Sequence, residues 1–326
     1  MNFRKFSNTD WRVSEIGLGC WAIGSEWGDV SKEDARDALV TSLDNGINFF
    51  DTADVYGDGR SELLIGELLK STKERIYVAT KSGRRLNPHT SKGYNIENIE
   101  AFIDRSLKNL GVDCIDLLQL HCPPSEVCSR KETYEMMDEI VKKGKISYYG
   151  VSVEKVSEAM DAIQFPNVKS IQIIFNIFRQ KPSDEFFREA AKKNVAIIAR
   201  VPLASGLLTG KMSKNSFFPS NDHRNYNIKG DFFDIGETFS GVNFDKGLNA
   251  VEELKGLIPN NFSLSDLALK WILMHQEVTV VIPGAKNKIQ SSMNANAVGL
   301  DDITSLMPLI RNIYDKYLKD DIHHRW

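Results

Sequence analysis

Four side chains at the ends of three apolar runs have the types needed for acid–base chemistry on a carbonyl group. Asp51 and Tyr56 follow the second apolar run of the chain, Lys81 follows the third and His121 follows the fourth. If the runs form parallel strands, their carboxyl ends share one edge of the sheet. We therefore expect these side chains to lie close together.

A tyrosine phenol can protonate a carbonyl oxygen if a nearby ammonium lowers its pKa, which is normally about 10. We expect Lys81 to lower the pKa of Tyr56 in this way. A carboxylate at Asp51 would keep the ammonium charged and in place. His121 can donate a hydrogen bond that orients the carbonyl. None of these side chains supplies a hydride, so reduction of the carbonyl would need a nicotinamide cofactor.

Each of these residues alone also has a structural interpretation. Asp51 could brace a loop, and Tyr56 could pack at the rim of a sheet. Lys81 could be solvated, and His121 could be a hydrogen-bonded core imidazole. Their joint placement after successive strands favours the chemical interpretation.

The elements that would position these residues alternate along the chain. We predict strands at 16–19, 47–50, 76–80, 115–120, 146–151, 170–175, 196–199 and 278–282. We predict helices at 31–45, 61–70, 96–110, 132–143, 156–163, 183–194, 246–257, 264–275, 289–297 and 303–318. This order predicts an α/β fold, a closed (β/α)8 TIM barrel with extra helices, in one domain over residues 1–326. A doubly wound open sheet is the alternative.

Three further segments carry expectations of their own. Residues 1–12 are polar and aromatic, which suits a hairpin that plugs the bottom of the barrel. The long irregular stretch at 207–243, after the seventh strand, is rich in phenylalanine and suits a cover over a bound cofactor. Residues 323–326 have the character of an exposed tail. In the helix at 61–70 we expect an apolar side formed by Leu63, Leu64, Ile65, Leu68 and Leu69.

Composition excludes several classes of protein. The 41 basic and 44 acidic residues give a net charge of -3, so nothing indicates binding to nucleic acid or to acidic membranes. No apolar run reaches the roughly 18 residues of a membrane span, and the first residues lack the apolar stretch of a signal peptide. Four cysteines do not make a disulfide scaffold, so we expect a cytoplasmic protein. The oligomeric state is not readable from the sequence.

Four motifs resemble those of the aldo-keto reductases. They are Asp51-Thr-Ala-Asp-Val-Tyr56-Gly, Thr80-Lys81-Ser-Gly, Leu117-Leu-Gln-Leu-His121 and Gly150-Val-Ser152, and the similarity runs over 16–297. The resemblance implies a (β/α)8 barrel that reduces an aldehyde or ketone, sugar-derived carbonyls included, to an alcohol with NAD(P)H. It assigns Tyr56 as proton donor, tuned by Lys81 and Asp51, with His121 orienting the carbonyl. Trp21, Tyr56 and His121 would form the substrate pocket.

The sequence has no Rossmann fingerprint for a cofactor, because Gly24, the third glycine after Gly17-Leu-Gly19, is misplaced. The resemblance implies a different cofactor site. Gly19 would let the backbone approach the nicotinamide, and Ser152 and Gln172 would hold its carboxamide. The pyrophosphate loop would comprise Pro202, Leu203, Ser205, Gly206, Leu207 and Lys211. Arg224 either reaches the same phosphates or is a solvated loop arginine.

The adenosine end would be formed by Gly284, Lys286, Gln290 and Asn294, with a helix starting near Lys288. The cation at Lys286 favours NADPH, while NADH stays possible. Lys286 replaces a frequent arginine of the family and Met293 a frequent glutamate, which weakens the preference for NADPH. Val153 stands where many members carry an asparagine.

Arg200 stands where many members place an aromatic residue that stacks on the nicotinamide. A guanidinium can also stack, but it would disfavour the cationic oxidised ring. We therefore expect Arg200 to bias the cofactor toward its reduced form.

The sequence also allows functions other than carbonyl reduction. Cys114, Cys122 and Cys128 with His121 have a poor spacing for zinc, and a metal-dependent hydrolase would need paired histidines, so we expect no metal. Some barrels of this kind are cofactor-binding regulatory subunits or redox sensors with little turnover; retention of His121 favours turnover. Three arginines, Arg84, Arg85 and Arg179, either bind a sugar phosphate or carboxylate or brace loops.

Overall fold

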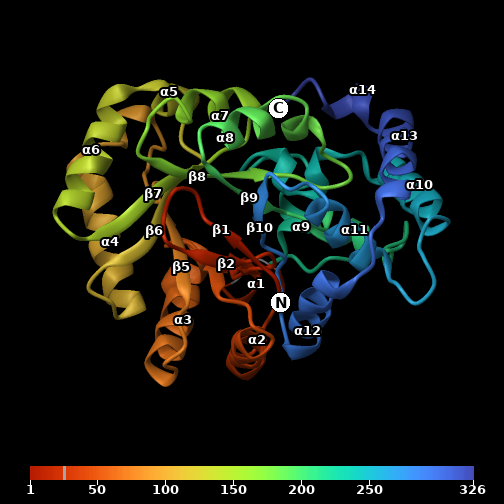
Figure 1. The fold of residues 1–326 in the computed structure, drawn as a ribbon, viewed down its shortest axis with the longest axis horizontal. Helices are drawn as coiled ribbons and strands as arrows, with labels where there is room; N and C mark the ends of the chain where they lie inside the picture. The colour runs from red at the N-terminus through yellow and green to blue at the C-terminus, as the bar shows by residue number, and fades with distance from the viewer. Residues whose placement is uncertain (25–26) are drawn as a thin grey trace.

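Eight parallel strands form the centre of the molecule in a computed structural model that describes residues 1–24 and 27–326 (Figure 1). The strands are β3 Leu18–Gly19, β4 Phe49–Asp51, β5 Tyr77–Ser82, β6 Ile115–His121, β7 Ile146–Ser152, β8 Val168–Ile174, β9 Ala196–Arg200 and β10 Val278–Val281. They pair in chain order from β3 to β10. Parallel bridges from Ile16 to Val281 and from Gly19 to Gly284 join the two ends. The sheet is therefore closed. This confirms the predicted (β/α)8 barrel and shows that the alternative, a doubly wound open sheet, is wrong.

Helices cover the outside of the barrel, as Figure 1 shows. The longer ones are α2 Lys32–Asp44, α3 Arg60–Ser71, α4 Ile96–Leu110, α6 Lys131–Lys142, α7 Val156–Ala162, α8 Phe186–Lys192, α10 Phe244–Lys255, α11 Leu264–Leu273, α12 Lys288–Asn296 and α13 Met307–Tyr317. Short helices are α1 Trp21–Gly24, α5 Ser125–Ser129, α9 His223–Tyr226 and α14 Lys319–Ile322. The 3-10 turns are η1 Tyr56–Gly59, η2 Ser91–Gly93, η3 Lys181–Ser183, η4 Ala204–Thr209, η5 Ile235–Glu237, η6 Phe239–Gly241, η7 Ala297–Gly299 and η8 Thr304–Leu306.

Local sequence signals account for the helix ends. The Ser31 hydroxyl accepts a hydrogen bond from the backbone N–H of Asp34 at the start of α2. Gly111 takes a φ of 68° at the end of α4, a left-handed conformation that glycine adopts without strain. One prediction here is wrong, because Leu63 of α3 is 52% exposed. It lies on the solvent side of a helix whose Leu64, Ile65 and Leu68 are buried.

The N-terminal hairpin closes the bottom of the barrel, as predicted. Its strands, β1 Phe3–Lys5 and β2 Arg12–Ser14, are antiparallel. Phe6 and Trp11 between them are buried against side chains that line the inside of the barrel. The guanidinium of Arg4 donates hydrogen bonds to the carbonyls of Leu273, His275 and Val278, which lie between α11 and β10. The chain's first strand is thereby held to its last barrel strand.

The stretch at 207–243 is less irregular than predicted. It contains α9, η5 and η6. Of its phenylalanines, Phe239 is buried and Phe218 and Phe233 are half-buried, whereas Phe217 and Phe232 are 84% and 72% exposed. Among the described residues no helix has the length and apolar content needed to cross a membrane.

Candidate active site

A cavity of about 310 Å³ opens at the carboxyl ends of the barrel strands. Its wall includes residues at or near the carboxyl ends of six of the eight strands, namely Gly19, Asp51, His121, Ser152, Gln172 and Arg200. Trp21 and Tyr56 line it beside them, with their rings stacked 5.9 Å apart. The βα loops of a barrel lie at this edge, and the sequence analysis predicted the catalytic residues there.

The acid, the amine and the phenol form one chain of contacts. The Nζ of Lys81 lies 2.5 Å from Oδ1 of Asp51, 2.8 Å from the carbonyl of Thr52 and 3.4 Å from the hydroxyl of Tyr56. Lys81 is 1% exposed and lies behind the cavity wall, whereas the other three predicted catalytic residues line the cavity. The ring of His121 meets that of Tyr56 edge-on at 6.0 Å. The structure thus brings all four residues together.

The tight turn η1 places Tyr56 at this position. Gly57 has a φ of 60°, and a Cβ added there would lie 2.5 Å from the carbonyl oxygen of Gly24. A glycine is therefore required for the phenol-bearing turn to pack against α1.

Two glutamine side chains complete the surroundings of Asp51. Gln119 donates to its Oδ2 at 3.0 Å and Gln172 donates to the same oxygen at 2.7 Å. Gln172 also donates to Oε1 of Gln119 at 3.2 Å. The sequence analysis missed Gln119, although its place two residues before His121 on one strand puts both on the same face. The amide nitrogen of Gln172, predicted to hold a carboxamide, is engaged by Asp51 here.

The expected lowering of the Tyr56 pKa is wrong. Burial raises the pKa of Tyr56 well above its usual range, and the charges of Asp51 and Glu237 raise it further. The charges of Arg84 and Arg200 lower it, but they do not outweigh the burial of the phenol. Burial also lowers the pKa of His121 well below its usual range, with Arg84 and Lys81 contributing. At neutral pH the phenol is therefore protonated and the imidazole is neutral, so both are able to donate hydrogen bonds.

The predicted cofactor residues line the same cavity with one exception. Those that line it are Gly19, Ser152, Gln172, Arg200, Pro202, Leu203, Ser205, Gly206, Lys211, Arg224, Gly284, Lys286, Gln290 and Asn294. Leu207 is not among the lining residues; its side chain is 1% exposed and belongs to the hydrophobic core. The lining also includes Trp27, Thr209 and Glu237, which the sequence analysis did not single out.

Two of the predicted phosphate-binding cations are held by the protein itself. The Nζ of Lys286 donates to the carbonyl of Trp27. Arg224 forms a fork on Asp222, at 2.9 Å from Nε to Oδ1 and 2.6 Å from NH2 to Oδ2. It also lies 5.0 Å from the ring centroid of Trp27. A phosphate would have to displace or share these contacts.

The helix α12 starts at Lys288, as expected, with the side chain of Asn287 accepting from the N–H of Gln290 at 3.0 Å. The side chain of Gln290 in turn accepts from the N–H of Lys286, and Asn294 donates to the carbonyl of Gly284. These two side chains therefore fix the shape of the segment at 284–286.

The donor set of the cavity fits a dinucleotide. One part of the wall carries the cations Lys211, Arg224 and Lys286, which suit phosphates. Another part carries the hydroxyl of Ser152 and the amide of Gln172 beside the phenol of Tyr56, which suit a nicotinamide and a carbonyl. These residues would hold the cofactor.

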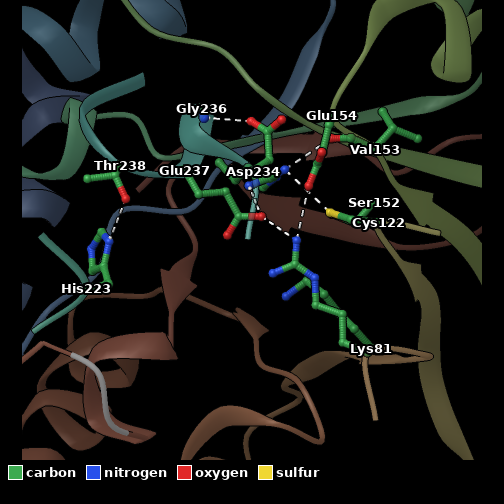
Figure 2. A network of polar contacts seen from close by, with 12 residues as sticks. Lys81, Cys122, Ser152, Val153, Glu154, His223, Asp234, Gly236, Glu237 and Thr238 are labelled. Carbon is green, nitrogen blue, oxygen red and sulfur yellow. Dashed lines mark hydrogen bonds and ion pairs between the residues drawn. The ribbon is translucent and has the colours of Figure 1, made fainter. Parts of the chain in front are cut away.

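A buried charge network lies beside these groups (Figure 2), and two of its members, Arg200 and Glu237, line the cavity. Arg84 contacts Glu237 at 2.6 Å and Glu154 at 3.2 Å. Arg200 lies 3.5 Å from Glu237 and donates to the carbonyl of Val153 at 3.1 Å. The network accounts for Arg84, which braces the loop that carries Glu237.

The other two unassigned arginines also brace loops. Arg85 pairs with Asp58 at 2.8 Å. Arg179 donates to the carbonyl of Glu154 at 2.6 Å, and its guanidinium lies 4.0 Å from the ring centroid of Trp326. The exposed tail predicted at 323–326 is therefore wrong for Trp326, which is 6% exposed. Its indole N–H donates to both carboxylate oxygens of Asp234, three residues before Glu237.

Cys122, Glu154 and Glu237 point toward one another in Figure 2, and each offers one possible metal ligand within 4.8 Å of the others. Both carboxyl groups contact Arg84, and burial raises the pKa of Cys122 to about 11, so the thiol is protonated. This chemistry does not favour a cation.

Comparison with known proteins agrees with this geometry. The sequence model of the Aldo/keto reductase family matches residues 15–305. The chain is 31% identical to "Aldo-keto reductase yakc [NADP(+)]" of Schizosaccharomyces pombe, over 92% of this chain and 88% of that protein. It is 28% identical to a "Probable voltage-gated potassium channel subunit beta" of Arabidopsis thaliana, over 95% and 94%.

The fold is similar to the holo form of aldo-keto reductase AKR11C1 from Bacillus halodurans, with a TM-score of 0.77, 26% identity and coverage of 100% and 99%. The family model matches most of the chain, and the barrel brings the phenol, the amine and the acid together at one end. These two findings settle the class of protein. This chain belongs to the aldo/keto reductase family and is an NAD(P)H-dependent reductase.

Proposed function

We propose that the protein reduces an aldehyde or ketone to an alcohol with NADPH, and that Tyr56 donates the proton. The observation that carries this proposal is the row of contacts from Asp51 through Lys81 to the hydroxyl of Tyr56 at the wall of the cavity. Sugar-derived carbonyls are among the candidate substrates. We also propose that the protein is a single domain and works in the cytoplasm, in accord with its composition.

A bound nicotinamide cofactor would supply the hydride for the carbonyl carbon, and the protein's own residues supply the proton and the orientation. The neutral phenol of Tyr56 donates its proton to the carbonyl oxygen as negative charge develops there. Lys81 then stabilises the phenolate from 3.4 Å away, and Asp51 holds the ammonium in position. His121 donates a hydrogen bond to the same oxygen, for which its neutral form is suited.

The choice of NADPH rests on the cations that line the cavity. Lys286 and Arg224 suit an additional phosphate, and one relative carries NADP(+) in its name. NADH is the alternative cofactor, because the frequent arginine is a lysine here and both cations are already engaged.

The alternative function is a cofactor-binding regulatory subunit, since one relative is named as a potassium channel subunit. His121 at the cavity wall favours turnover over this alternative. The test is a panel of aldehydes, ketones and sugars, followed by the loss of NADPH absorbance. Turnover of at least one carbonyl supports the proposal. Tight NADPH binding without oxidation by any of them contradicts it and supports the regulatory function.

A further inference from the structure

The carboxylate of Glu237 comes from a segment distant in sequence from the catalytic residues, yet it lines their cavity. It belongs to η5, in the stretch after β9, and is 5% exposed. Burying a carboxylate is costly unless cations pair with it. The structure therefore must provide partners for it, and their number and position determine the charge of the cavity wall.

Two arginines serve as these partners. Arg84 follows β5, three residues after Lys81, and its NH2 lies 2.6 Å from Oε1 of Glu237. Arg200 ends β9 and its NH1 lies 3.5 Å from the same oxygen. Burial alone would raise the pKa of Glu237, but these two guanidiniums lower it to about 2. Glu237 is therefore ionised at neutral pH.

The second acidic residue of the network, Glu154, is not ionised to the same extent as Glu237. Burial raises its pKa to about 8, and the charges of Glu237 and Asp234 contribute, so it is largely protonated at neutral pH. Glu154 does not line the cavity, whereas Glu237 and Arg200 do. Farther from the cavity, Arg179 lies against Trp326 near Asp234. The charge that balances Arg200 at the wall is thus that of Glu237.

The remaining charge near the catalytic tyrosine is also balanced. Asp51 lines the cavity and is paired with Lys81 behind the wall at 2.5 Å. Trp21, Tyr56 and the neutral His121 supply the rest of this part of the wall. A substrate that reaches Tyr56 therefore meets aromatic rings and two ion pairs, with no cation free of a carboxylate in this part of the described wall.

We infer that Glu237 sets the charge class of the substrate: by neutralising Arg200 at the cavity wall, it restricts the site to uncharged carbonyl compounds. This inference rests on the proposed carbonyl reduction. A substrate carboxylate at Arg200 has to compete with Glu237 and is repelled by it. Without the Glu237 charge, Arg200 would be an unpaired cation at the cavity wall, and a substrate carboxylate would be its natural partner.

The experiment compares two substrates of nearly equal shape, para-carboxybenzaldehyde and its methyl ester. The measured quantity is the ratio of kcat/KM for the acid to kcat/KM for the ester. We expect wild type to prefer the ester. We expect Glu237→Gln to raise the ratio on the order of 10- to 100-fold, the range of one charge-assisted contact. The ratio cancels any general loss of activity that the substitution causes.

Glu154→Gln is the matched control, because it removes the other carboxyl contact of Arg84 outside the cavity lining. We expect it to leave the ratio unchanged within about threefold, the uncertainty of context for such contacts. If Glu237→Gln does not fold, Arg200→Gln provides the opposite change. It leaves the negative charge of Glu237 in excess and is expected to lower the ratio about tenfold.

The outcomes separate the two proposals. If wild type oxidises NADPH with neither aldehyde nor any other carbonyl, the proposed reduction is wrong. If wild type reduces the ester but the ratio does not rise in Glu237→Gln, or does not fall in Arg200→Gln, the role of Glu237 is wrong. A wild-type preference for the acid would also overturn it.

Discussion

Replacing Tyr56 by phenylalanine removes one oxygen atom from the cavity and tests the chemistry directly. The hydroxyl accepts from Lys81 at 3.4 Å, but the ammonium keeps shorter contacts to Asp51 at 2.5 Å and to the carbonyl of Thr52 at 2.8 Å. The substitution therefore leaves no buried charge unpaired. The ring that stacks on Trp21 also remains.

From these contacts we expect the free energy of unfolding to change by less than about 1 kcal/mol, the value of one long hydrogen bond. We expect kcat to fall on the order of 10²–10⁴-fold, because a positioned general acid is lost. Binding of NADPH should be almost unchanged, since the cations that suit its phosphates lie elsewhere on the wall.

The assay combines three measurements on Tyr56→Phe and wild type: NADPH oxidation with a carbonyl from the panel, quenching of protein fluorescence by NADPH, and denaturant unfolding. Activity equal to that of wild type would remove Tyr56 from its proposed role. If stability falls strongly together with activity, the hydroxyl contributes more to the free energy of unfolding than its contacts indicate.

Three further predictions concern the cofactor and pH. Lys286→Ala should weaken NADPH binding about tenfold or more while NADH is little affected, as seen by titration with both; a parallel loss would contradict the phosphate contact. Arg200→Leu should strengthen binding of NADP⁺ relative to NADPH, because it removes the guanidinium and leaves the negative charge of Glu237 at the cavity wall. An unchanged ratio of the two dissociation constants would refute the expected bias of Arg200 toward the reduced cofactor. Burial raises the pKa of Asp54 to about 7. The folded state therefore keeps a proton that the unfolded state releases near pH 4, and stability falls as pH rises from about 4 to about 7, by at most about 1.4 kcal/mol per pH unit. Asp54→Asn should remove this contribution. The check is the free energy of unfolding of both proteins at about pH 5 and about pH 8. An equal change with pH in wild type and variant would contradict the prediction.

Much of the barrel could be predicted because its strands are short apolar runs between helix signals. The runs at 115–120 and 146–151 became β6 and β7 with their ends shifted by one residue. The residues after these runs converged because a parallel barrel brings its strand ends together. Spacing along the sequence was enough for that part of the site.

The electrostatics of the site could not be predicted from spacing. The sequence places Lys81 near Tyr56, but burial and the charges of Asp51 and Glu237 decide the direction of the pKa. Glu237 itself follows a long connection whose path depends on tertiary packing. Nothing local indicated that Trp326 would lie against Arg179 and Asp234, because such a contact spans much of the chain.

The same long-range character governs how the chain reaches its folded state. The first barrel strand pairs with the last through Ile16 and Val281, and Arg4 binds carbonyls beyond residue 270. During synthesis, β3 therefore has an unpaired edge until nearly the whole chain has left the ribosome. Closure of the ring is a late event with a large loop-closure entropy, so folding is expected to be slow and to need protection of that edge from aggregation.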